Sequence, residues 1–185
     1  FTGQQSFMST EQDREAPPAE SDSLFNFMKE QNIDYQREDH RPVFTVAESK
    51  TLNLKLQGGA TKNLFLRDKK GKRHFLFSVE QGKQVDLKGL SALLDSSRLS
   101  LGSSERLWKY LGILPGTVSL LALINDSSGE VEVLIDEDLW EQETILCHPL
   151  VNSSTLALRQ ADLERFIHQT GHSFQLVRVP KKTAD

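Results

Sequence analysis

Hydrophobic residues follow two spacings along this chain, one typical of helices and one typical of strands. Apolar side chains recur at helical spacing over residues 23–32, which predicts a short amphipathic helix there. The run from Thr45 to Glu48 has the form of a capping box, so a second helix is predicted from Val46 onward. The pattern further predicts an extended piece near Tyr35 and three more helices over residues 86–94, 103–111 and 160–170.

Alternating apolar residues predict two hairpins. The first joins strands at residues 61–68 and 74–79 through a basic turn. The second joins residues 130–135 to residues 118–125, which are apolar on both faces and are therefore predicted to form a central strand. With a last strand at residues 174–179, the pattern predicts an α/β (α+β) fold: a mixed, largely antiparallel sheet with packed helices.

The chain length of 185 residues fits one domain. Residues 1–20 are polar and acidic and include two adjacent prolines, so we expect a disordered N-terminal segment followed by one domain over residues 21–180. Met8 is interpreted as the natural start, and residues 1–7 as a remnant of a tag.

Composition excludes several classes of function. Cys147 is the single cysteine, so an intramolecular disulfide and a thiolate metal cluster are excluded. No apolar run approaches the roughly 20 residues that span a bilayer, and no signal-peptide pattern is seen, so a cytoplasmic protein without a membrane partner is expected. The net charge of −4 argues against a protein that coats DNA, but it permits one that grips only the end of an RNA. A monomer without a cofactor is expected.

Lys62 is the first candidate for chemistry. On a strand it shares a face with Leu64 and Leu66, and an ammonium group buried there without a partner would be costly. Either its side chain extends to water at the strand end, or it reaches a cleft and meets an anionic or carbonyl oxygen. Asn63 would then face the other way or mark the rim of the cleft, where it can both donate and accept hydrogen bonds.

Two glycine segments invite a ligand-binding interpretation. Residues 57–62 lack the spacing and the strand-to-helix context of a phosphate-binding loop, so a flexible turn is favoured. Gly116 follows the helix predicted at 103–111. It is either part of a tight turn, which the sequence alone favours, or a point where the backbone approaches a ligand with its amide donors.

His148 lies beside Cys147, but neighbours on a strand point to opposite faces, so the two do not form a nucleophilic pair. A lone histidine is more often structural than catalytic. His168 and His172 are four residues apart but lack a third ligand, so no metal site is predicted. The sequence also lacks the G-x-S-x-G motif of serine hydrolases.

Taken in order, six short motifs resemble the YbaK/ProX family, the free-standing relatives of the editing domain inserted in bacterial prolyl-tRNA synthetases. The resemblance covers roughly residues 23–179. The motifs begin at His40 (HRPVFTV), Thr61 (TKNLFLRDKKG), Arg98 (RLS), Leu114 (LPG), Leu123 (LIND) and His148 (HPLVN).

The resemblance implies a hydrolase that cleaves the ester between a tRNA and a wrongly attached amino acid, with the acceptor end of the tRNA as partner and prolyl-tRNA synthetase as a further candidate. Asn63 after the lysine is similar to the alanine-specific ProX type, whereas the cysteine-specific YbaK type has threonine there. The catalytic residues expected by carry-over are Lys62, Asn63 and Gly116. The expected substrate-binding residues are Phe44, Val46, Ser119, Asp126 and His148.

The family also implies catalysis assisted by a ribose hydroxyl of the substrate, because no general base emerges from the sequence. Leu120 departs from the proline or small residue that the family often has, which leaves the choice of substrate open. The alternatives are a deacylase for Cys-tRNA or Ser-tRNA, and a module that binds a tRNA end or a synthetase without catalysis. A zinc or serine hydrolase has little support.

Overall fold

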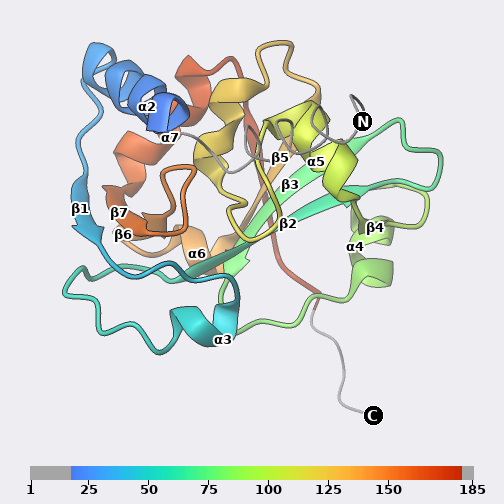
Figure 1. Ribbon diagram of the computed structural model, residues 1–185. Helices are drawn as coiled ribbons and strands as arrows, with labels where there is room; N and C mark the ends of the chain where they lie inside the picture. Colours follow the sequence, from blue (N-terminus) through green and yellow to red (C-terminus); the bar gives the residue numbers. More distant parts are fainter. Residues whose placement is uncertain (1–17, 181–185) are drawn as a thin grey trace, which may run out of the picture.

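The computed structural model describes residues 18–180 (Figure 1). Most of the expected segment at residues 1–20 lies outside this range, and residues 18–20 form the first turn of a helix. The elements are α2 (Pro18–Glu30), β1 (Gln36–Asp39), α3 (Val46–Ser49), β2 (Thr61–Arg67), β3 (His74–Glu80), α4 (Leu87–Leu93), β4 (Ser100–Leu101), α5 (Ser104–Leu111), the 3-10 helix η1 (Leu120–Asn125), β5 (Val131–Asp136), α6 (Glu137–Trp140), β6 (Thr144–Cys147), β7 (Ser154–Arg159), α7 (Gln160–Gln169) and β8 (Phe174–Val177).

Two sheets organise the molecule. The larger has the order β4-β2-β3-β5-β8, in which β4, β2 and β3 are antiparallel while β5 runs parallel to both β3 and β8. The smaller has the order β1-β7-β6 and is antiparallel throughout. A bridge between Gly59 and Ile145 connects the start of β2 with β6. The predicted mixed, largely antiparallel α/β arrangement is confirmed.

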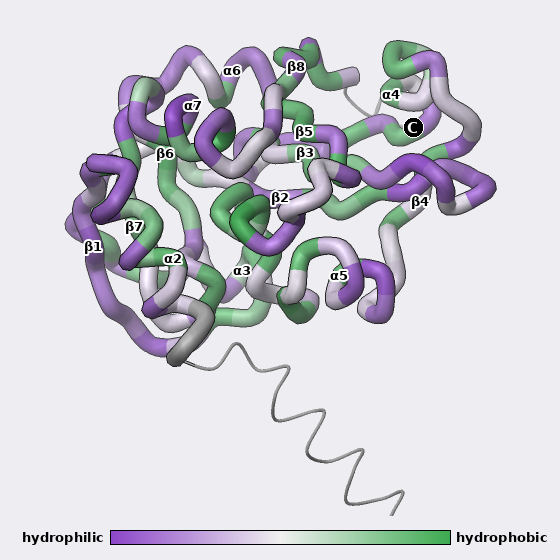
Figure 2. Tube along the Cα trace, turned by 90° about the horizontal axis from the view of Figure 1, so that it is seen from above, coloured by the Kyte–Doolittle hydropathy of each residue, from purple (hydrophilic) through white to green (hydrophobic). Residues whose placement is uncertain are grey.

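The hydrophobic core has two parts, one on each face of the larger sheet. One part contains Phe65 of β2 and is covered by α2, α5, η1, α7 and the smaller sheet. The other contains Leu66 and lies under α4. Figure 1 shows α2 and α7 side by side at the end of the molecule that holds the smaller sheet, and Phe27 meets Phe166 there edge to face. In Figure 2, the exposed strand β1 is hydrophilic along its length, as expected for the outer strand of the smaller sheet.

The predicted helix starts follow from side-chain caps. The Thr45 hydroxyl accepts a hydrogen bond from the Glu48 N–H, Asp86 caps α4, and Ser103 caps α5. Gly112 ends α5 in the left-handed conformation with φ of 61°, which glycine adopts without strain.

The central strand predicted at residues 118–125 is wrong. Leu120–Asn125 forms the 3-10 helix η1, and the Ser119 hydroxyl caps it by accepting from the Leu121 N–H. A short apolar run is buried equally well as a strand or as a helical segment, so its periodicity does not distinguish them. The second predicted hairpin is therefore absent: β5 pairs in parallel with β3. Sequence analysis also missed α6, β4, β6 and β7, which are short and lack a regular alternation of apolar and polar residues.

Asp126, at the end of η1, ties three segments together. Its carboxylate accepts from the backbone N–H groups of Glu130 and Val131 at 3.1 and 2.9 Å, and it contacts His172 Nε2 at 2.8 Å. The side chains of Asp126 and His172 are only 3% and 2% exposed. This aspartate therefore fixes the entry into β5 against the end of α7.

Asp126→Ala is expected to lower the free energy of unfolding by about 3 kcal/mol, because it leaves buried donors without an acceptor. Urea denaturation followed by circular dichroism measures the loss. Asp34→Ala is the control, since its carboxylate is 84% exposed and lies 3.9 Å from Arg159; it should cause no measurable change. Equal stability of the two variants would contradict this role of Asp126.

Candidate functional site

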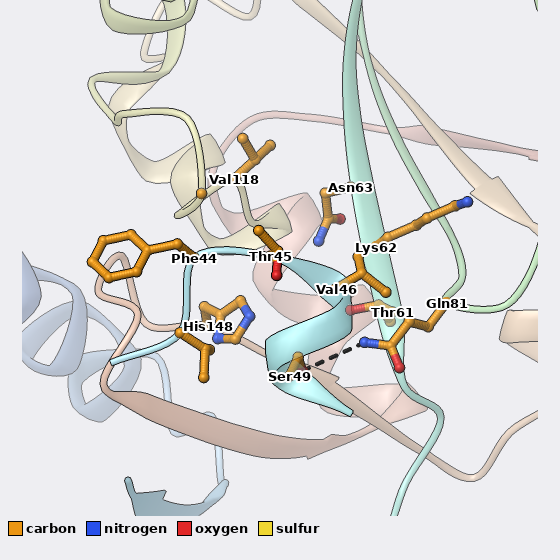
Figure 3. A pocket seen from close by; sticks show the side chains of 12 residues that line it. Phe44, Thr45, Val46, Ser49, Thr61, Lys62, Asn63, Gln81, Val118 and His148 are labelled. Atoms are coloured by element: carbon orange, nitrogen blue, oxygen red, sulfur yellow. Dashed lines mark hydrogen bonds between the residues drawn. The ribbon is translucent and has the colours of Figure 1, made fainter. Parts of the chain in front are cut away.

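A small cavity of about 140 Å³ lies where five segments meet: the residues around α3, the start of β2, Gln81 after β3, the loop before η1, and His148 after β6 (Figure 3). Its lining contains no carboxylate. The lining residues are Val43, Phe44, Thr45, Val46, Ser49, Thr61, Lys62, Asn63, Gln81, Gly116, Val118 and His148.

The start of β2 sends two neighbouring side chains in opposite directions. Asn63 is on the face of Phe65 and points into the cavity, whereas Lys62 is on the face of Leu64 and Leu66, as predicted (Figure 3). The Lys62 stem lines the edge of the cavity, and its ammonium donates a hydrogen bond to the Lys83 carbonyl. Burial lowers the pKa of Lys62, and the nearby charge of Lys50 lowers it further.

The Asn63 carboxamide has spare hydrogen-bonding capacity. Its Oδ1 is buried and accepts no hydrogen bond from the described part of the chain. Ser78 is its register partner on β3, and the Ser78 Oγ is likewise buried without a partner among residues 18–180. Because buried polar atoms are nearly always paired in native proteins, such an unpaired group beside a cavity is a candidate for contact with a ligand.

The opposite wall is formed by Phe44 and Gly116. The Phe44 N–H donates to Glu48 Oε2 at 3.1 Å, so the capping box of α3 also fixes the backbone of Phe44. The Phe44 ring is 66% exposed at the rim. Gly116 has a φ of 92°, which a residue with a side chain rarely adopts, and a Cβ at this position would lie in ordinary contact with the Phe44 carbonyl, at 3.5 Å. Glycine is thus required here by the backbone turn that closes the wall.

His148 borders the cavity as a neutral ring. Burial lowers its pKa, an effect that a hydrogen bond with the Ser154 carbonyl opposes only in part. That contact joins His148 Nδ1 to the Ser154 oxygen at 3.3 Å. The His148 backbone is held by Ser119, whose hydroxyl donates to the His148 carbonyl at 2.7 Å.

The structure therefore brings six of the eight expected site residues to one cavity: Phe44, Val46, Lys62, Asn63, Gly116 and His148. Ser119 is fully buried behind the wall, and Asp126 contacts other segments, so neither lines the cavity. Sequence analysis missed Gln81 and Ser49, whose side chains meet across the cavity edge at 3.5 Å. Neither belongs to a motif, and only the fold brings them together.

No group of three or more His, Cys, Asp or Glu side chains between residues 18 and 180 is arranged to hold a metal ion. None of the helices within that range is long and apolar enough to cross a bilayer.

Comparison with known proteins places these residues in a family context. The family model of the aminoacyl-tRNA editing domain matches residues 40–166. The prolyl-tRNA editing protein ProX of Acetoanaerobium sticklandii is 36% identical over 82% of this chain and 93% of the relative. The prolyl-tRNA synthetase associated domain-containing protein 1 of Danio rerio is 38% identical over 81% of this chain and 82% of its own. A solved structure described as a candidate trans-editing enzyme for prolyl tRNA synthetase superposes with a TM-score of 0.68 at 16% identity. It covers 89% of this chain and 98% of its own, and it supports the fold alone.

His74, which is buried, and His148, which is partly buried, predict a pH dependence of stability. Burial lowers the pKa of His148 and of His74 below the ordinary value of 6.5, and Arg106 lowers that of His74 further. Near pH 6.5 the two histidines bind protons in the unfolded chain but not in the folded protein. The free energy of unfolding therefore decreases as the pH falls through that region. His74→Gln and His148→Gln should each lose less stability than the wild type between pH 7.5 and 5.5. Urea midpoints measure this, and an unchanged pH dependence in both variants would contradict it.

Proposed function

Because this chain belongs to the aminoacyl-tRNA editing domain family, we propose that it is a trans-editing deacylase that hydrolyses mischarged Ala-tRNA(Pro). The observation that carries the proposal is the small cavity, where the Asn63 carboxamide points inward beside Lys62 and the walls hold no carboxylate. The names of the relatives, which refer to prolyl-tRNA editing and to prolyl-tRNA synthetase, support proline tRNA as the substrate.

The size and charge of the cavity suit an esterified amino acid. A volume of about 140 Å³ is below the roughly 300–1,000 Å³ of sites for drug-sized ligands, so a small aminoacyl group fits better than a large molecule. Lys62 lines the cavity with its stem, and Lys50 is near enough to lower the pKa of Lys62, so positive charge lies beside the cavity, where a nucleotide phosphate could approach. The partner proposed on this basis is the acceptor end of a tRNA, bound by a monomer, with prolyl-tRNA synthetase as a further candidate.

Ester hydrolysis requires an activated water and stabilisation of the oxyanion that develops on the ester carbonyl. Asn63 can donate through its amide group, Gly116 presents backbone close to the cavity, and Lys62 supplies positive charge. None of the lining residues is a carboxylate, and His148, held by the Ser154 carbonyl through Nδ1, offers only its Nε2 as a base. Following the family resemblance, we assign the positioning of water to a ribose hydroxyl of the terminal adenosine, with the protein supplying fixed electrostatics.

A size sieve explains why such an activity is needed. Alanine is smaller than proline, and a missing few carbons changes binding by only about 1–3 kcal/mol, so a synthetase site rejects alanine poorly. A second cavity that admits alanine but excludes proline provides the missing discrimination. The cavity between Phe44, Gly116 and His148 has walls fixed by backbone geometry, as a sieve requires.

Lys62→Ala and Asn63→Ala should each lower kcat/KM for Ala-tRNA(Pro) by roughly 100-fold, about the loss seen when one stabilising group is removed from an oxyanion site. Deacylation is followed with tRNA charged with radiolabelled alanine. Lys88→Ala is the control, since Lys88 is exposed on α4 and outside the cavity. If Lys62→Ala deacylates as fast as the wild type, the role assigned to Lys62 is wrong.

The sieve predicts that Ala-tRNA(Pro) is hydrolysed while Pro-tRNA(Pro) is left intact, because the cavity wall excludes the larger ring. Parallel time courses with alanine, proline, cysteine and serine on tRNA measure the preference. Cleavage of the proline ester would refute the sieve, and faster cleavage of the cysteine or serine ester would reassign the substrate. Binding of every tRNA without turnover would identify a non-catalytic module.

A further inference from the structure

The Lys62 ammonium has no acidic partner in the ion pairs formed by residues 18–180. Its hydrogen bond goes instead to the backbone carbonyl of Lys83. A carbonyl holds an ammonium group in place without neutralising its charge, so that charge remains available to an anionic oxygen of a substrate. The position of the charge then depends on what fixes the Lys83 carbonyl.

The Lys83 carbonyl belongs to a tight turn, Glu80 to Lys83, that follows β3. The turn is closed by a hydrogen bond from the Lys83 N–H to the Glu80 carbonyl at 3.1 Å. The Gln81 N–H donates to the Ala60 carbonyl at 2.9 Å, which ties the turn to the residue before β2. One turn thus contacts the beginning of the strand that carries Lys62 and also supplies the acceptor for its side chain.

Asp136, the last residue of β5, fixes this turn at both ends. Its Oδ2 accepts from the Glu80 N–H at 3.2 Å, and its Oδ1 contacts Lys83 Nζ at 2.9 Å. The Asp136 side chain is 1% exposed and the Lys83 side chain 10%. Asp138 contacts the same Lys83 ammonium at 2.5 Å. Burial opposes the charge of Lys83, but the hydrogen bonds that its ammonium donates to Asp138 and Asp136 outweigh burial and raise the pKa of Lys83.

We propose that Asp136 and Lys83 are positioning residues for Lys62: the buried carboxylate fixes the Glu80–Lys83 turn, and the last carbonyl of that turn holds the Lys62 ammonium in place beyond the stem that lines the cavity edge (Figure 3). The catalytic consequence rests on the function proposed above, whereas the structural link does not. A lysine side chain loses rotamer entropy when it is fixed, so an acceptor provided in advance spares the substrate complex part of that cost. The carboxylates of Asp136 and Asp138 pair with the Lys83 ammonium and not with Lys62, so the charge of Lys62 remains available.

Double-mutant cycles test this link. Asp136→Asn keeps the shape of the side chain but removes the charge that anchors Lys83, and Lys83→Gln is the second variant in case Asp136→Asn folds poorly. Each should lower kcat for Ala-tRNA(Pro) about 10-fold and change KM less than about twofold, since misplacement of a catalytic group affects the chemical step. In a Lys62→Ala background the same substitutions should change kcat less than about twofold, because the group that they position is already absent. Lys83→Arg, which keeps the ion pair, should recover most of the activity.

Asp162→Asn is the matched control. Asp162 is also a buried aspartate, paired with Arg159 at 3.2 Å, but it lies on α7 away from the cavity. Asp162→Asn should change kcat by the same factor in the wild type and in the Lys62→Ala background. A full 10-fold loss from Asp136→Asn in the Lys62→Ala background would overturn the proposal, because it would show that Asp136 does not act through Lys62.

A second cycle uses urea midpoints and needs no activity. The double variant Lys62→Ala/Asp136→Asn should lower the urea midpoint by less than the sum of the two single-variant shifts. In the double variant Lys62→Ala/Asp162→Asn, the shift should equal the sum of the two single-variant shifts. Strict summation for both pairs would overturn the link between Asp136 and Lys62. If the wild type hydrolyses no aminoacyl-tRNA, the proposed function fails, while this cycle still decides whether the turn positions Lys62.

Discussion

The period of two along β2 is the constraint on which the site depends. Lys62 and Asn63 are neighbours, so a strand conformation sends one to each face of the larger sheet. The amide group enters the cavity, while the ammonium reaches around the strand to a backbone carbonyl. A shift of one residue in the pairing of β2 with β3 would exchange the two and would also turn Phe65 and Leu66 into the wrong halves of the core. The two-part core therefore fixes which of the polar neighbours faces the substrate.

The cavity walls come from distant parts of the sequence, and hydrogen bonds to the backbone hold them together. The Val43 N–H donates to the Asn152 carbonyl, which connects the segment before α3 with the loop after β6. The Thr61 hydroxyl donates to the Leu146 carbonyl, and the Ser119 hydroxyl to that of His148. Because each contact ends on backbone, the shape of the cavity depends on the fold more than on the rotamers of flexible side chains. A site that separates alanine from proline by size requires such fixed walls.

Local signals in the sequence predicted much of this structure. The caps at Thr45 and Ser103, the hairpin of β2 and β3 and the opposite directions of Lys62 and Asn63 all follow from interactions within a few residues. The failures concern long-range pairing. Residues 120–125 are apolar on every side and satisfy a buried strand and a buried 3-10 helix equally, so only the parallel pairing of β5 with β3 decides between them. Asp126 was expected at the site because it belongs to a motif of the family, yet its partners are backbone groups and a histidine 46 residues away.

The charge distribution of the cavity also limits the chemistry that the protein can supply. A general base would need a carboxylate or a neutral histidine with a free nitrogen facing the substrate, and the lining offers the latter only at His148. Its Nδ1 contacts the Ser154 carbonyl, which orients the ring and leaves Nε2 as the nitrogen that could act as a base. The other polar groups of the lining stabilise negative charge: an amide, backbone N–H groups and one lysine that has no carboxylate partner among the ion pairs of residues 18–180. Under the proposed function, these groups would lower the barrier by fixed electrostatics, and the hydroxyl group next to the ester bond of the substrate would position the water.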